Sequence, residues 1–105
     1  MRVRITASVL TVLCAWVLWE KHMSNTGVHE ITAIQEMGML LDCRKAIPDA
    51  LKKAEVDLQE RFKGPKYNVV RAHDGVILSD DGKTVRHAYV YYCLPPTVDP
   101  YHDPR

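Results

Sequence analysis

The sequence predicts a small α+β domain in which one amphipathic helix packs on one face of an antiparallel sheet of three or four strands. Three observations predict this class. Apolar residues recur every three or four positions between residues 40 and 62, which is the period of a helix with one buried face. Short β-branched or alternating runs stand before and after that stretch, separated by turn residues. Two cysteines, Cys43 in the helical stretch and Cys93 in the last run, are placed to join helix and sheet.

The first residues have the layout of a secretory signal. Arg2 and Arg4 supply positive charge, and residues 5–19 then contain no charged side chain. This run is shorter than the ~20 residues that a helix needs to cross a bilayer, so cleavage after Ala15 and retention as a short anchor both stay open. We therefore expect a signal or membrane-anchor helix over 1–15, one domain over 16–94 and an extended Pro-rich tail over 95–105.

The cysteine pattern predicts a disulfide and an extracytoplasmic location. Cys14 lies in the apolar N-terminal run, which leaves Cys43 and Cys93 as an even pair in an exported domain. In that setting a disulfide is favoured over a metal site or a catalytic thiol. The sequence thus predicts a Cys43–Cys93 bridge in a periplasmic, envelope or secreted protein.

The residues after the presumed cleavage site predict a hairpin. The aromatic and β-branched run Trp16–Trp19 fits either a first strand or the end of the anchor helix. Residues 24–27 have turn chemistry because Asn and Gly accept positive φ. Partial alternation over 28–36 then predicts a second strand that pairs back on the first.

The helical stretch begins near Leu40 and has clear start and stop signals. Asp42 can serve as the N-cap, and Gly64 followed by Pro65 ends the helix. Pro48 is unusual inside a helix because proline has no backbone N–H to donate. Either the helix kinks there or a short turn precedes a main helix that starts near Pro48. The apolar stripe comprises Leu40, Cys43, Ile47, Leu51, Ala54, Leu58 and Phe62.

Three further runs have β character. They cover residues 67–71, 75–78 and 84–94, and the Asp-Gly pair at 81–82 predicts a hairpin turn before the last of them. Side chains alternate along a strand.

If Cys93 is bonded to the helix, Tyr89 and Tyr91 must therefore lie under the helix. Val90 and Tyr92 must then face the other side of the sheet.

Residues 15–20, Cys43 and residues 93–100 together resemble a loose set of small exported bacterial proteins of unknown function. The shared features are a signal peptide, a V-L-W opening, one helix cysteine and a C-L-P-x-T-V-D-P ending. In that set the position of Pro96 is usually acidic, and a helix proline such as Pro48 is atypical. The resemblance implies export and the disulfide, and it implies no activity.

The charge pattern argues against a nucleic-acid partner. The chain has 14 basic and 13 acidic side chains, and they alternate along the sequence instead of clustering. Neither a basic footprint for nucleic acid nor a polybasic membrane patch is present in the sequence. Contact with a membrane is expected only through the N-terminal segment, if it is not removed.

The sequence offers no catalytic, cofactor-binding or metal-ligating residues that we would assign. Gly82, Lys83 and Thr84 match the end of a phosphate loop, but Ile77 replaces its first glycine. None of the histidines stands at the spacing of a metal motif. The five histidines are His22, His29, His73, His87 and His102.

Aromatic residues supply the one candidate binding surface, because Tyr and Trp are enriched in interaction patches. Its members are Trp16, Trp19, Val90 and Tyr92. We expect a non-enzymatic binding or structural module with a protein partner in the cell envelope. The alternatives are a small exported hydrolase or metal-dependent enzyme, and a membrane-tethered accessory subunit.

Overall fold

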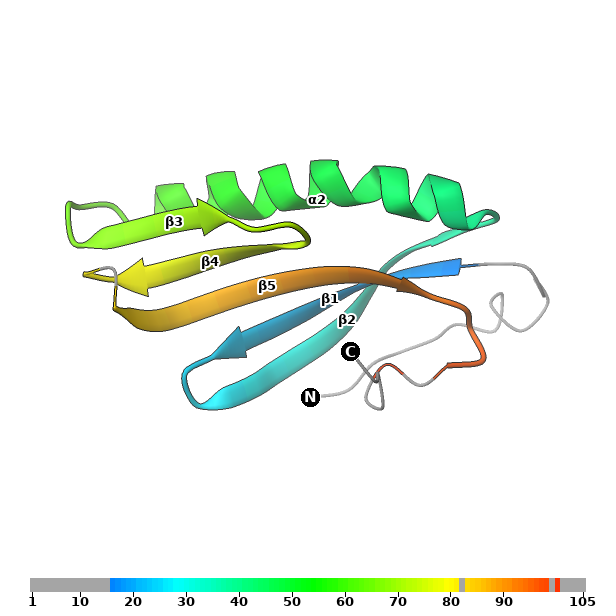
Figure 1. Ribbon diagram of the computed structural model, residues 1–105, viewed down its shortest axis with the longest axis horizontal. Coiled ribbons are helices and arrows are strands. Elements are labelled where there is room, and N and C mark those ends of the chain that lie inside the picture. Colours follow the sequence, from blue (N-terminus) through cyan, green and yellow to red (C-terminus); the bar gives the residue numbers. More distant parts are fainter. Residues whose placement is uncertain (1–15, 82, 99, 101–105) are drawn as a thin grey trace.

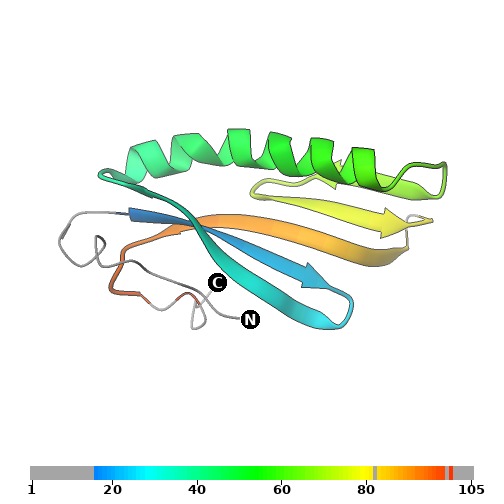
Figure 2. The ribbon, with the colours of Figure 1, turned by 180° about the vertical axis from the view of Figure 1, so that it is seen from behind.

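The computed structural model describes residues 16–81, 83–98 and 100. One helix, α2, lies along one face of a five-stranded antiparallel sheet with strand order β2-β1-β5-β4-β3 (Figure 1, Figure 2). The predicted signal or anchor over 1–15 lies outside the described residues. The strands are β1 (Trp16–Ser24), β2 (Gly27–Met37), β3 (Tyr67–Arg71), β4 (Gly75–Asp80) and β5 (Thr84–Leu94).

The α+β class is confirmed, but the predicted count of three or four strands is wrong. The run Trp16–Trp19 continues through polar residues to Ser24 and pairs with β2 on one side and β5 on the other. Its charged side chains find partners inside the sheet. Glu20 accepts a hydrogen bond from the Tyr91 hydroxyl at 2.5 Å, and the Lys21 ammonium lies 5.6 Å from the centre of the Tyr92 ring. These contacts let a charged segment serve as a central strand.

The β1–β2 hairpin turns where the sequence predicts it. Ser24 pairs with Gly27, which has φ of 120° and so occupies a region that favours glycine. The register shifts once between Leu18 and Trp19 and again between His22 and Met23, so β2 carries one extra residue at each point.

Helix α2 is one uninterrupted helix from Leu40 to Arg61 and contains Pro48. Its N-cap is Met39, with no side-chain capping bond, so the prediction of Asp42 as the cap is wrong. Asp42 instead lies in the first turn, where a carboxylate interacts favourably with the helix dipole. The helix ends at Arg61, shortly before Gly64, as the stop signals predict. Its C-cap is Phe62, whose N–H donates a hydrogen bond of 2.9 Å to the Leu58 carbonyl.

The predicted parity of β5 is confirmed. Tyr91 is buried in the cluster beneath α2, with Tyr89 and Cys93 packed against it, whereas Val90 and Tyr92 belong to a second cluster on the opposite face. The Cys43–Cys93 disulfide joins the helix to β5, as the cysteine pattern predicts. The buried residues beneath α2 are Leu18, Cys43, Leu51, Leu58, Val76, Leu78 and Tyr91.

The face of the sheet away from α2 has its own core. Val17, Trp19, Ile31 and Tyr92 are buried there. After β5 the chain turns below this face (Figure 1). Residues 95–98 form a turn closed by a hydrogen bond of 3.1 Å from the Val98 N–H to the Pro95 carbonyl. The sheet is therefore packed on both faces.

Candidate functional site

Strand β5 has an open edge beyond the end of β4. Strand β1 pairs with β5 as far as Leu94, but the pairing of β4 with β5 stops at Gly75 and Val90. The last contact on that side is a hydrogen bond of 2.9 Å from the Tyr91 N–H to the Asp74 carbonyl. In an antiparallel strand, the backbone groups of residues two apart point the same way. The N–H and C=O of Cys93 therefore point toward a position that no strand of the described residues fills.

Gly75 explains how β4 can lie so close to β5 before the chain leaves the sheet. A Cβ atom at this position would lie 2.9 Å from the Tyr89 carbonyl oxygen, a distance that real Cβ atoms do not show. The connection is then tied back by a hydrogen bond of 2.7 Å from the Ala72 N–H to the Gly75 carbonyl. This tight connection carries His73 and Asp74 past the end of β4.

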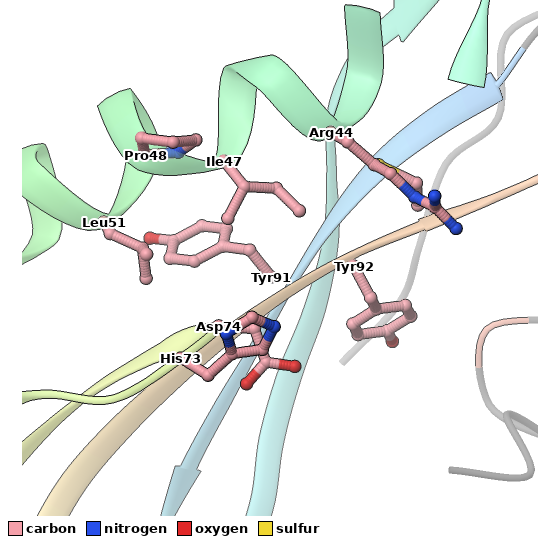
Figure 3. Close-up of a pocket in the computed structure, with 9 residues that line it drawn as sticks. Arg44, Ile47, Pro48, Leu51, His73, Asp74, Tyr91 and Tyr92 are labelled. Carbon is pink, nitrogen blue, oxygen red and sulfur yellow. The ribbon is translucent and has the colours of Figure 1, made fainter. Parts of the chain in front are cut away.

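A cleft of about 470 Å³ lies between α2 and this open edge (Figure 3). Ile47 and Leu51 project from α2 toward the Tyr91 ring, which is only 3% exposed and forms an apolar floor (Figure 3). Tyr92 contributes from β5 but turns its ring to the other side of the strand (Figure 3). The lining residues are Arg44, Ile47, Pro48, Leu51, His73, Asp74, Tyr91, Tyr92 and Cys93.

Charged groups border the cleft at two places. Arg44 extends from the first turns of α2, while His73 and Asp74 lie on the β3–β4 connection, apart from it (Figure 3). Arg44 is exposed and makes no ion pair with any other residue that the structure describes. Its guanidinium can therefore bind a carboxylate of a ligand without first losing a partner.

Pro48 changes the helix turn above the cleft. Proline has no backbone N–H, so the Arg44 carbonyl lacks the donor that residue 48 would supply in a regular helix. The helix continues through this position, and the proline ring itself lines the cleft.

A second cavity, of about 420 Å³, lies on the other side of Tyr91 between α2 and the β1–β2 hairpin. Glu20 and Tyr91 both line this cavity, and the Tyr91 hydroxyl donates a hydrogen bond to the Glu20 carboxylate. Burial and this carboxylate neighbour raise the pKa of Tyr91, so the hydroxyl stays protonated and donates. Tyr91 therefore separates the two cavities and holds β1 to β5.

Histidines from β1, β2 and β5 gather near the end of α2. His22 Nε2 lies 2.9 Å from His87 Nδ1, and the His22 ring stacks on Tyr89 at 4.5 Å between centres. His29 lies beside His22 at 5.3 Å and bonds to Ser24. Burial is the largest cause that lowers the pKa of both His22 and His87, and neighbouring histidines add to it. The lowered pKa favours the neutral form of His22 and His87, and their rings pack with Tyr89 and His29 as an aromatic group.

No group of three or more metal-ligating side chains is close enough to hold an ion within the part of the chain that the structure describes. Nor does any helix among those residues have the length and apolar character needed to span a membrane.

The structure divides the four residues of the candidate aromatic surface between the two faces. Trp16 packs against the cluster beneath α2, whereas Trp19, Val90 and Tyr92 belong to the opposite cluster. The exposed fractions of Trp19 and Tyr92 are 1% and 4%, so both rings serve as core.

Arg44 and Asp74 line the cleft but were not considered as site residues in the sequence. The other lining residues were named there for the helix, the core, the histidine inventory, the aromatic surface or the disulfide: Ile47, Pro48, Leu51, His73, Tyr91, Tyr92 and Cys93. The one available signal was Pro48, a helix-interior proline with no obvious local purpose.

Comparisons with protein-family models, with curated proteins and with solved structures find no significant match to this chain.

Proposed function

We propose that this chain is an exported, non-enzymatic domain that binds a protein partner in the cleft between α2 and the open edge of β5. Export is supported by the Cys43–Cys93 disulfide, since such bonds persist in oxidising compartments. A small domain that depends on this bond is suited to the cell envelope or the extracellular space.

One observation carries the proposal: unpaired strand backbone borders an apolar cleft that is large enough for a ligand. The cleft volume of about 470 Å³ lies within the range of roughly 300–1,000 Å³ typical of ligand sites. The cleft has apolar walls, formed by Ile47, Leu51 and Tyr91. Backbone and charged groups at its border can orient a bound ligand. Sites that bind polypeptide segments combine these two features.

Site-specific photo-crosslinking in the cells that produce the protein tests the proposal. A benzoylphenylalanine placed at Pro48, an exposed residue of the cleft, should form a covalent adduct with a partner of defined mass. The matched control is the same group at Val56, which lies on the same helix, is 42% exposed and does not line the cleft. Adducts from neither position, or equally from both, would contradict the proposal.

A further inference from the structure

The open edge of β5 is suited to a polypeptide strand in particular. An added strand would lie about 4.8 Å from β5, opposite Cys93 and beyond the connection that carries Asp74. It could exchange hydrogen bonds with the N–H and C=O of Cys93, which no described strand pairs. A small apolar molecule could fill the volume of the cleft but would leave these backbone groups unpaired.

The bordering charges give this strand a preferred composition. Arg44 follows Cys43, whose disulfide places it beside Cys93, while the carbonyl of Asp74 is bonded to Tyr91. The cation and the carboxylate therefore border different parts of the open edge (Figure 3). Charge complementarity favours an acidic group beside Arg44.

We propose that the cleft binds an extended segment of a partner protein as a short additional strand on β5, an inference that rests on the function proposed above. The segment faces Cys93 with its backbone and carries an acidic side chain beside Arg44. Because the Asp74 carbonyl already accepts a hydrogen bond from the Tyr91 N–H, the added strand pairs with β5 only beyond Tyr91.

A peptide-display selection tests the composition. The probe is a library of random octapeptides selected on the disulfide-bonded protein, and enriched peptides should share an acidic side chain. Arg44→Glu should weaken the Kd of an enriched peptide by about tenfold or more, because it replaces an attraction by a repulsion. Lys45→Glu is the matched control: it makes the same charge change on an adjacent exposed residue that does not line the cleft, and should leave Kd within about twofold.

Hydrogen exchange and backbone methylation test the strand pairing. Bound peptide should slow exchange of the Cys93 amide. N-methylation of the residue that faces Cys93 should abolish binding, because it removes the donor and blocks close approach.

The outcomes separate this inference from the function on which it rests. Peptides that compete with crosslinking from position 48, yet leave the Cys93 amide unprotected, would overturn strand addition and leave binding in the cleft intact. Failure to enrich any peptide, or equal loss of binding with Arg44→Glu and Lys45→Glu, would also overturn the inference. Loss of the specific crosslink itself would overturn the proposed function.

Discussion

Removal of the Cys43–Cys93 bridge should destabilise the domain by about 4 kcal/mol. The two cysteines are 50 residues apart. On the chain-entropy model, closing a loop of that length lowers the conformational entropy of the unfolded chain, which raises its free energy by about 4 kcal/mol. A domain of this size has a total stability of roughly 5–15 kcal/mol. The bridge therefore accounts for a large share of the free energy of unfolding.

The measurement is a urea titration of the oxidised protein and of the Cys43→Ala/Cys93→Ala variant. With a denaturant slope of roughly 1–2 kcal/mol/M for a small domain, the unfolding midpoint should fall by about 2 M or more. The reduced wild-type protein is the control, because it keeps both sulfur atoms in the core and lacks only the covalent link. Cys43 is fully buried, so its replacement also removes packing.

Loss of the link and loss of packing give different results. If the loop argument is correct, the reduced protein loses about 4 kcal/mol, and the double variant loses at least as much because it also loses the packing of Cys43. A reduced protein that stays within about 1 kcal/mol of the oxidised one would refute the reasoning. The contribution would then come from side-chain packing around Cys43.

Three further outcomes follow from contacts in the sheet. Tyr91→Phe should cost about 1–3 kcal/mol in a urea titration, because it leaves the β1 glutamate without its donor; an unchanged midpoint would show that water replaces the hydroxyl. Gly75→Ala should cost about 1–3 kcal/mol because the new Cβ meets backbone, whereas Gly38→Ala, with nothing within 4 Å, should be tolerated; equal effects would contradict the close approach. For His22 and His87 the folded pKa lies below the unfolded value of 6.5, so the unfolded state binds more protons and thermal stability should fall as pH drops below about 6.5. A melting temperature that rises on acidification, or the same dependence in a variant with both imidazoles replaced by glutamine, would count against this.

Periodicity predicted the helix and the orientation of the last strand. The apolar stripe identified Cys43, Leu51 and Leu58, which are the buried residues of α2. The alternation in β5, combined with the disulfide, correctly placed Tyr91 beneath the helix and Tyr92 on the opposite face. Both inferences depend on local repeats that the backbone geometry imposes.

Features that depend on distant partners were not accessible in the same way. Glu20 looks unsuited to a central strand until its hydrogen bond to Tyr91, 71 residues away, is known. The cap prediction failed at Asp42 because several neighbouring residues can begin a helix, and tertiary contacts choose among them. The cleft was missed because it arises where β1 pairs with β5 farther along than β4 does, which leaves Arg44 and Asp74 at two different borders of one open edge.

The interior position of β1, next to β5, determines when the sheet can assemble during biosynthesis. The first strand pairs with the last, Val17 opposite Leu94, and Cys93 must also be present before the bridge can form. Until β5 has been made, the chain can form only the local hairpins β1–β2 and β3–β4, because no other strand connects them. A product terminated before residue 84 would retain a reduced Cys43 and two unjoined hairpins with exposed edges. Such fragments are exposed to proteolysis and to incorrect thiol pairing, so the stability of the domain depends on synthesis through β5.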